Sequence, residues 1–72
     1  MSERYVRIYV AQPPDVGAEW VVRVDSDEPA RFRHEKDALT YALRQARART
    51  GQGVSVELRV EDDYGHWRSM AL

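Results

Sequence analysis

One segment with helical periodicity, flanked on both sides by segments in which apolar and polar residues alternate, constrains the fold of this chain more than any other feature. From about Glu35 to Thr50, apolar residues recur at intervals of three and four and form one stripe, which consists of Ala38, Leu39, Ala42, Leu43 and Ala46. Acidic residues in the first turn and arginines in the last turn match the helix dipole. We expect Gly51 to end the helix in the left-handed conformation. The three alanines in the stripe predict a helix that lies close against a sheet.

Four other segments have the features of strands. They run from Tyr5 to Val10, from Trp20 to Asp25, from Val54 to Glu61 and from His66 to Met70. A loop with two adjacent prolines, Gln12 to Gly17, separates the first pair. A turn from Asp62 to Gly65 joins the second pair into a hairpin. The residues around Arg31 and Phe32 could extend the sheet, although they are too few to show a period.

This order of elements predicts the α+β class, with a β-β-α-β-β chain, a four-stranded and mostly antiparallel sheet, and one helix packed on one face. The sequence has no internal repeat, linker or low-complexity segment, so we expect residues 1–72 to form a single domain. A core of this size usually needs disulfides, a metal or a partner chain in addition. Because the sequence contains no cysteine, disulfides are excluded, and we expect a homo-oligomer, most simply a dimer.

The sequence also restricts where the protein can act. Apolar runs such as Trp20-Val21-Val22 are far shorter than the roughly 20 residues that span a bilayer, so we expect no membrane association. The start, Met1-Ser2-Glu3-Arg4, lacks the order of a signal peptide, and we expect a cytoplasmic protein. With 11 basic and 12 acidic side chains, the net charge of −1 excludes a general attraction to polyanions. Any nucleic-acid site must therefore be local.

We find no recognisable catalytic machinery in the sequence. Its two histidines, His34 and His66, lie beside no serine and acidic partner in the spacing of a triad. Asp62 and Asp63 could form a cation site together with His66, but they lack the defined ligand order of metal-binding loops. The Gly51-Gln52-Gly53 segment follows the helix, whereas phosphate-binding glycines precede one. We therefore expect a protein that is not an enzyme and that needs neither a cofactor nor a metal.

The outward face of the expected sheet is the candidate binding surface. If the helix covers the face with Val6, Ile8, Val22 and Leu58, the other face interleaves aromatic and arginine side chains. Its candidate residues are Tyr5, Arg7, Tyr9, Val21, Arg23 and Arg59, together with either His66 and Arg68 or Trp67 from the last strand, whose phase the sequence leaves open. Such a face is typical of platforms for single-stranded nucleic acid, in which rings stack on bases and guanidinium groups contact phosphates.

A protein interface explains the same residues, because Tyr and Arg are also enriched where proteins meet. A half-apolar open sheet in a small protein favours a homodimer contact, and Glu57 and Glu61 on the same face weaken the nucleic-acid interpretation. We therefore expect a homodimeric binding module. Its candidate ligands are single-stranded nucleic acid and DNA. The alternative is a protein–protein interaction module, such as an antitoxin-like or regulatory subunit.

The pattern from Tyr5 to Arg68 resembles domain of unknown function family 2188, a family of small bacterial proteins. The matching features are the first strand at Tyr5, Trp20-Val21-Val22, Phe32, Lys36-Asp37-Ala38 at the start of the helix, Ala42 and Ala46-Arg47 along it, and Asp63-Tyr64-Gly65 before the last strand. This resemblance implies the fold and a bacterial origin but no activity. The hairpin followed by a helix that opens with Asp37-Ala38-Leu39 is also similar to antitoxin subunits of the HicB type, which pair with a toxin and bind DNA.

Overall fold

The computed structural model of the chain describes residues 5–25 and 27–70. It contains strands β1 (Tyr5–Ala11), β2 (Trp20–Val24) and β3 (Ala30–Phe32), helix α1 (Glu35–Thr50), and strands β4 (Ser55–Glu61) and β5 (Trp67–Met70). One expectation falls outside the described residues, namely the absence of a signal peptide, which rests on residues 1–4.

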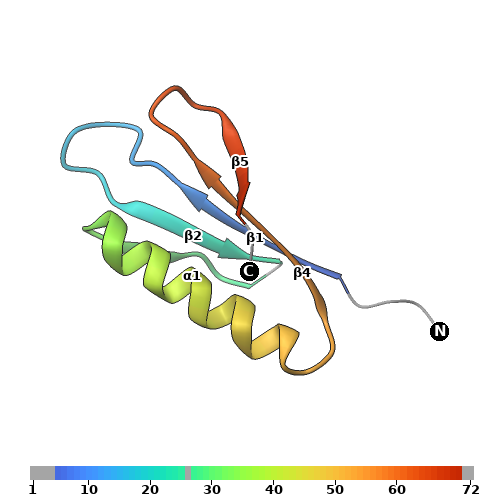
Figure 1. The fold of residues 1–72 in the computed structure, drawn as a ribbon. Helices are drawn as coiled ribbons and strands as arrows, with labels where there is room; N and C mark the ends of the chain where they lie inside the picture. Colours follow the sequence, from blue (N-terminus) through green and yellow to red (C-terminus); the bar gives the residue numbers. More distant parts are fainter. Residues whose placement is uncertain (1–4, 26, 71–72) are drawn as a thin grey trace.

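The sheet has five strands in the order β3-β2-β1-β4-β5, and it is mixed, because one pair is parallel while the other pairs are antiparallel, as predicted for most of the sheet (Figure 1). The predicted count of four was wrong because β3, with three residues, is too short to show a period. The central pair, β1 and β4, is parallel, with Tyr5 opposite Ser55 and Val10 opposite Val60. Parallel strands require a long crossover, and α1 supplies it between β3 and β4. All other neighbouring strands are antiparallel.

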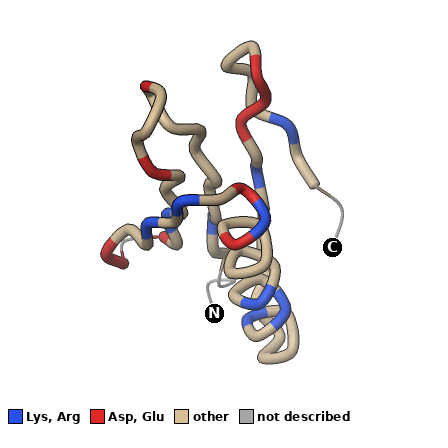
Figure 2. Tube along the Cα trace, turned by 90° about the vertical axis from the view of Figure 1, so that its left-hand side faces the viewer, with Lys and Arg blue, Asp and Glu red and all other residues tan. Residues whose placement is uncertain are grey.

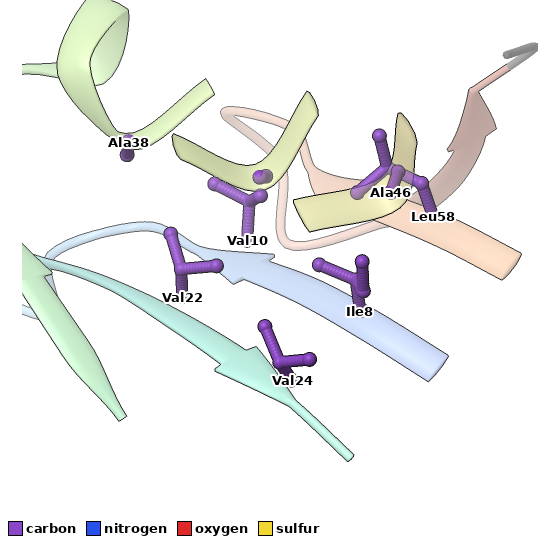
Figure 3. Close-up of a cluster of buried hydrophobic side chains, with 8 residues drawn as sticks. Ile8, Val10, Val22, Val24, Ala38, Ala46 and Leu58 are labelled. Atoms are coloured by element: carbon purple, nitrogen blue, oxygen red, sulfur yellow. The ribbon is translucent and has the colours of Figure 1, made fainter. Parts of the chain in front are cut away.

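Helix α1 lies across one face of the sheet, as predicted, and the core lies between the two layers (Figures 1 and 3). The alternation of β1, β2 and β4 directs the buried side chains Ile8, Val10, Val22, Val24 and Leu58 toward the helix. There they meet the fully buried alanines Ala38, Ala42 and Ala46. Leu39 and Leu43, which complete the predicted stripe, are only half-buried and pack against this buried cluster. The close approach of helix and sheet thus depends on the absence of larger side chains in the middle of the stripe.

The end of α1 differs from the prediction for Gly51. That residue keeps right-handed helical backbone, with φ of −63°, and its N–H still donates to the Arg47 carbonyl at 3.0 Å. The positive φ occurs two residues later, at Gly53, where it is 78°. This turn brings the Val54 N–H to the Arg49 carbonyl at 3.1 Å and directs the chain into β4.

The loop between β1 and β2 and the β4–β5 hairpin lie side by side at one end of the sheet (Figure 1). Gln12 connects them, because its side-chain Nε2 donates to Asp63 Oδ1 and its backbone N–H donates to Glu61 Oε1, each at 2.9 Å. Both loops carry acidic residues, whereas basic residues lie along the strands and the C-terminal half of the helix (Figure 2). In the described ranges, the single helix is too short and polar to cross a membrane.

Candidate functional site

The face of the sheet opposite α1, here called the open face, brings together six of the seven predicted site residues. Because β1, β2 and β4 are in register, side chains that alternate with the core residues all point to this face. These predicted residues are Tyr5, Arg7, Tyr9, Val21, Arg23 and Arg59. The β1–β2 pair places Tyr9 opposite Arg23, and the β1–β4 pair places the same tyrosine opposite Arg59. Tyr9 is therefore the centre of the open face.

The seventh predicted residue, Arg68, does not belong to the open face. It is paired with Val60, whose side chain packs against the core, so Arg68 points to the helix side of β5. Its Nε donates to Asp62 Oδ2 at 2.9 Å. Trp67 occupies the open face instead, because it lies opposite Glu61. Assigning Arg68 to the site was wrong because all four residues of β5 are exposed, so its sequence has no apolar alternation to indicate a phase.

Trp67 and Tyr9 form an aromatic pair on the open face. Their ring centroids are 5.4 Å apart, with an interplanar angle of 77°, which is the edge-to-face arrangement that aromatic quadrupoles favour. Trp67 remains 44% exposed, and Tyr5, further along β1, is 49% exposed. The indole of Trp67 is thus oriented by a protein contact and retains accessible surface on which a planar ligand group can stack.

Charged and phenolic groups of β1 and β4 form a second cluster. Glu57 accepts a hydrogen bond from the Tyr5 hydroxyl and forms an ion pair with Arg59. The Tyr5 hydrogen bond, with the nearby Arg59 charge, lowers the pKa of Glu57, and the same hydrogen bond raises the pKa of Tyr5. The guanidinium of Arg7 lies 5.6 Å from the centre of the Tyr5 ring. Arg59 is thus neutralised by Glu57, and it is less available to an external anion than the sequence suggests.

Three other arginines form what we call the arginine row, which consists of Arg7 on β1, Arg23 on β2 and Arg31 on β3. Arg31 lies opposite Val21, and each member is displaced by two residues from the next, so the row runs diagonally over three adjacent strands. Diagonal neighbours in a sheet are about 7–8 Å apart. Within residues 5–25 and 27–70, no carboxylate lies within ion-pairing distance of these three side chains. From the sequence, Arg31 was missed as a site residue. The available signal was its place, two positions after Pro29, in a segment that could extend the sheet.

The acidic turn, which the sequence raised as a weak cation site, has a different role. One oxygen of Asp62 accepts hydrogen bonds from the backbone N–H groups of Tyr64 and His66, each at 2.9 Å, and the other accepts the bond from Arg68. The Arg68 hydrogen bond, followed by those from the backbone, lowers the pKa of Asp62 to about 2. The described residues contain no group of three side chains suited to a metal ion. Asp62 therefore organises the hairpin that carries Trp67.

Comparison of the chain with protein-family models, with curated proteins and with solved structures yields no match. The resemblance to domain of unknown function family 2188 stays a prediction. The site must be interpreted from its own geometry.

Proposed function

We propose that this chain is a non-enzymatic binding module whose open face binds single-stranded nucleic acid. The observation that carries the proposal is the arginine row beside the Tyr9–Trp67 pair on one uncovered sheet face. Guanidinium groups hold phosphates by charge and by paired hydrogen bonds. Exposed rings on a sheet stack on unpaired bases of any sequence. The two features lie on the two halves of the same face, where one strand can contact both.

The distribution of the arginines supports an extended backbone as the ligand. Diagonal neighbours about 7–8 Å apart are spaced comparably to successive phosphates along an extended single strand. Arg7, Arg23 and Arg31 would contact the backbone over β1, β2 and β3, while bases reach Trp67 and Tyr5. Because the protein carries a net charge of −1, this local row, not the overall charge, would attract the strand.

A homodimer through the open face fits this geometry less well. A two-fold interface is self-complementary, so each copy would present the arginine row to an identical surface. Two carboxylates of that surface already have partners, because Glu57 binds Tyr5 and Arg59 and Glu61 accepts from the Gln12 backbone. Burying unpaired guanidinium groups is costly. A polyanion supplies the missing charges, which favours nucleic acid over a second copy on this face.

The test is a titration of a fluorescent mixed-sequence oligonucleotide at several salt concentrations, read by anisotropy. Three phosphate contacts predict a slope of log affinity against log salt of about −2, because each contact releases counterions. Arg23→Gln should weaken binding and reduce that slope by about 0.7. Arg44→Gln is the matched control, because Arg44 is an exposed arginine on α1, on the other side of the molecule. It should change neither value.

Two outcomes would contradict the proposal. One is the absence of binding even at low salt. The other is equal behaviour of Arg23→Gln and Arg44→Gln, which would mean that binding is unspecific electrostatic attraction. If Tyr9→Ala instead yields a folded monomer from a dimer, and moderate salt has little effect on the dimer, the open face is a protein interface.

A further inference from the structure

The two edges of the sheet differ in how they are protected. Strand β3, at one edge, has only three residues, follows Pro29 closely and carries the exposed Arg31. Short length, proline and charge are the features by which natural edge strands avoid pairing with other chains. The β3 edge is therefore blocked by its own sequence.

Strand β5, at the other edge, is also short and carries Arg68, but it contains no proline and it exposes large apolar side chains. Its four residues are all exposed, with Trp67 on the open face and Met70, 39% exposed, on the helix side. Helix α1 packs against the other four strands but leaves β5 uncovered in the described part of the chain. An edge strand with exposed apolar side chains on both faces is a surface that a further strand can cover.

The backbone of β5 also has free hydrogen-bonding groups in a defined place. At the hairpin, the Asp62 N–H donates to the His66 carbonyl at 2.8 Å, so these residues form a hydrogen-bonded pair. Such pairs alternate along an antiparallel ladder. Arg68 therefore also pairs with β4, whereas the N–H and C=O groups of Trp67 and Ser69 point away from it. Ser69 lies near the middle of the outer edge.

We propose that β5 pairs in antiparallel fashion with β5 of a second copy, with the two-fold axis at Ser69. Residues that lie opposite each other in a sheet have their side chains on the same face, whereas neighbours along a strand alternate between the faces. The two-fold axis must therefore place one residue opposite its own symmetry mate. An axis at Arg68 would place two guanidinium groups directly opposite each other, which is destabilising. An axis at Ser69 places Arg68 opposite the partner subunit's Met70. The serine backbones then exchange two hydrogen bonds across the axis.

This interface is independent of the proposed function, because it leaves the open face uncovered. It joins two five-stranded sheets into one, with both open faces on the same side. The Trp67 rings of the two copies then lie near the axis, and the arginine rows lie toward the two outer ends. The dimer expected from the sequence is thereby assigned to an edge instead of a face.

Oppositely charged substitutions at one exposed position test both the interface and its register. Met70→Glu places a carboxylate opposite the partner's Arg68, whereas Met70→Lys places a second cation there. Each cross-strand pair contributes about 0.2–1 kcal/mol and the dimer contains two, so the dissociation constant should fall or rise by about 2- to 30-fold. Sedimentation equilibrium measures both constants against the wild type. An unchanged constant in both variants, or a strictly monomeric wild type at high micromolar concentration, overturns the proposal.

Crosslinking gives a second measurement that does not depend on charge. The chain has no cysteine, so Ser69→Cys introduces a single thiol next to its symmetry mate. A short bis-maleimide should convert most of this variant into a covalent dimer. Arg31→Cys, on the blocked β3 edge, is the matched control and should stay uncrosslinked under the same treatment. Equal crosslinking of the two variants would show that β5 is not the contact.

Discussion

The ring of Tyr9 on the central strand β1 meets the indole of Trp67 on the edge strand β5 at a centroid distance of 5.4 Å. The contact spans the intervening strand β4. Edge-to-face pairs contribute about 0.5–1.5 kcal/mol beyond the area that they bury. The pair therefore fixes the edge hairpin relative to the middle of the open face, and the orientation of the Trp67 ring is set before any ligand arrives.

Replacing that indole should separate binding from folding. We expect Trp67→Ala to weaken oligonucleotide binding by about 5- to 150-fold, which corresponds to the loss of one stacked base at about 1–3 kcal/mol. Trp20→Phe is the control and should keep the wild-type affinity, because Trp20 packs against the core on the helix side. In that variant Trp67 is the sole tryptophan, and its fluorescence should be quenched on binding. Unquenched fluorescence in a bound complex would exclude stacking on Trp67.

Acid should loosen the β4–β5 hairpin in a defined pH range. The pKa of Asp62 falls from 3.8 to about 2 on folding, chiefly through the Arg68 hydrogen bond. A carboxylate with a lowered pKa stabilises the fold above its unfolded pKa, and this contribution is lost as the pH falls through the folded value. We therefore expect the Asp62 contribution to be complete above about pH 4 and absent below about pH 2.

The variant Asp62→Asn checks this assignment. Its thermal stability should be lower than that of the wild type at neutral pH, and the two should converge as the pH is reduced to 2, the folded-state value. Asp63→Asn leaves the Asp62 contacts in place and should keep the wild-type dependence in this range. A constant difference between Asp62→Asn and the wild type from neutral pH to pH 2 would show that the carboxylate charge is not what holds the hairpin.

The two glycines after α1 should respond differently to substitution. Gly53 has a φ of 78°, a conformation that costs a residue with a side chain about 1–2 kcal/mol. Gly51, with its helical φ of −63°, accepts alanine without such strain. For a domain of this size, Gly53→Ala should lower the melting temperature by about 4–16 °C, with a smaller change for Gly51→Ala. The reverse order would mean that the left-handed turn lies at Gly51, as its sequence position suggests.

The fully buried Ala42 should not accept a larger side chain. It lies at the middle of the contact between α1 and the sheet, and added methylenes in a packed core cost about 1–3 kcal/mol. A small core contributes about 3–5 kcal/mol in total, so Ala42→Leu should leave a marginally folded protein. Ala48→Leu is the matched control, because Ala48 is exposed on the same helix. Urea unfolding should distinguish the two, and equal midpoints would place the helix in a different phase.

Local patterns in the sequence predict those parts of the fold that depend on one element alone. The alternation of β1, β2 and β4 encodes which side chains share a face, and the phase of Tyr9, Arg23 and Arg59 was predictable for that reason. No such pattern exists in β5, which is exposed on both faces, and the choice between Trp67 and Arg68 depends on its register with β4. The neutralisation of Arg59 by Glu57 likewise depends on side-chain geometry that the alternation of β4 does not specify.

Features that depend on two distant elements were not predictable. The parallel pairing of β1 with β4 follows from the path of the crossover helix, which the order of elements alone leaves open. The place of the positive φ depends on where β4 begins, because both Gly51 and Gly53 could turn the chain. Arg31 joins the site only through its pairing with Val21.

The parallel pair β1–β4 also determines when the sheet can form during synthesis and refolding. Each contact between these strands, such as Tyr5 with Ser55, closes a loop of about 50 residues. Strand β1 therefore cannot pair with β4 until most of the chain has been made. Domains dominated by such distant contacts fold more slowly than those with local ones. A nascent chain that ends before β4 exposes one full edge of β1, so this protein is most vulnerable to aggregation just before its last hairpin leaves the ribosome.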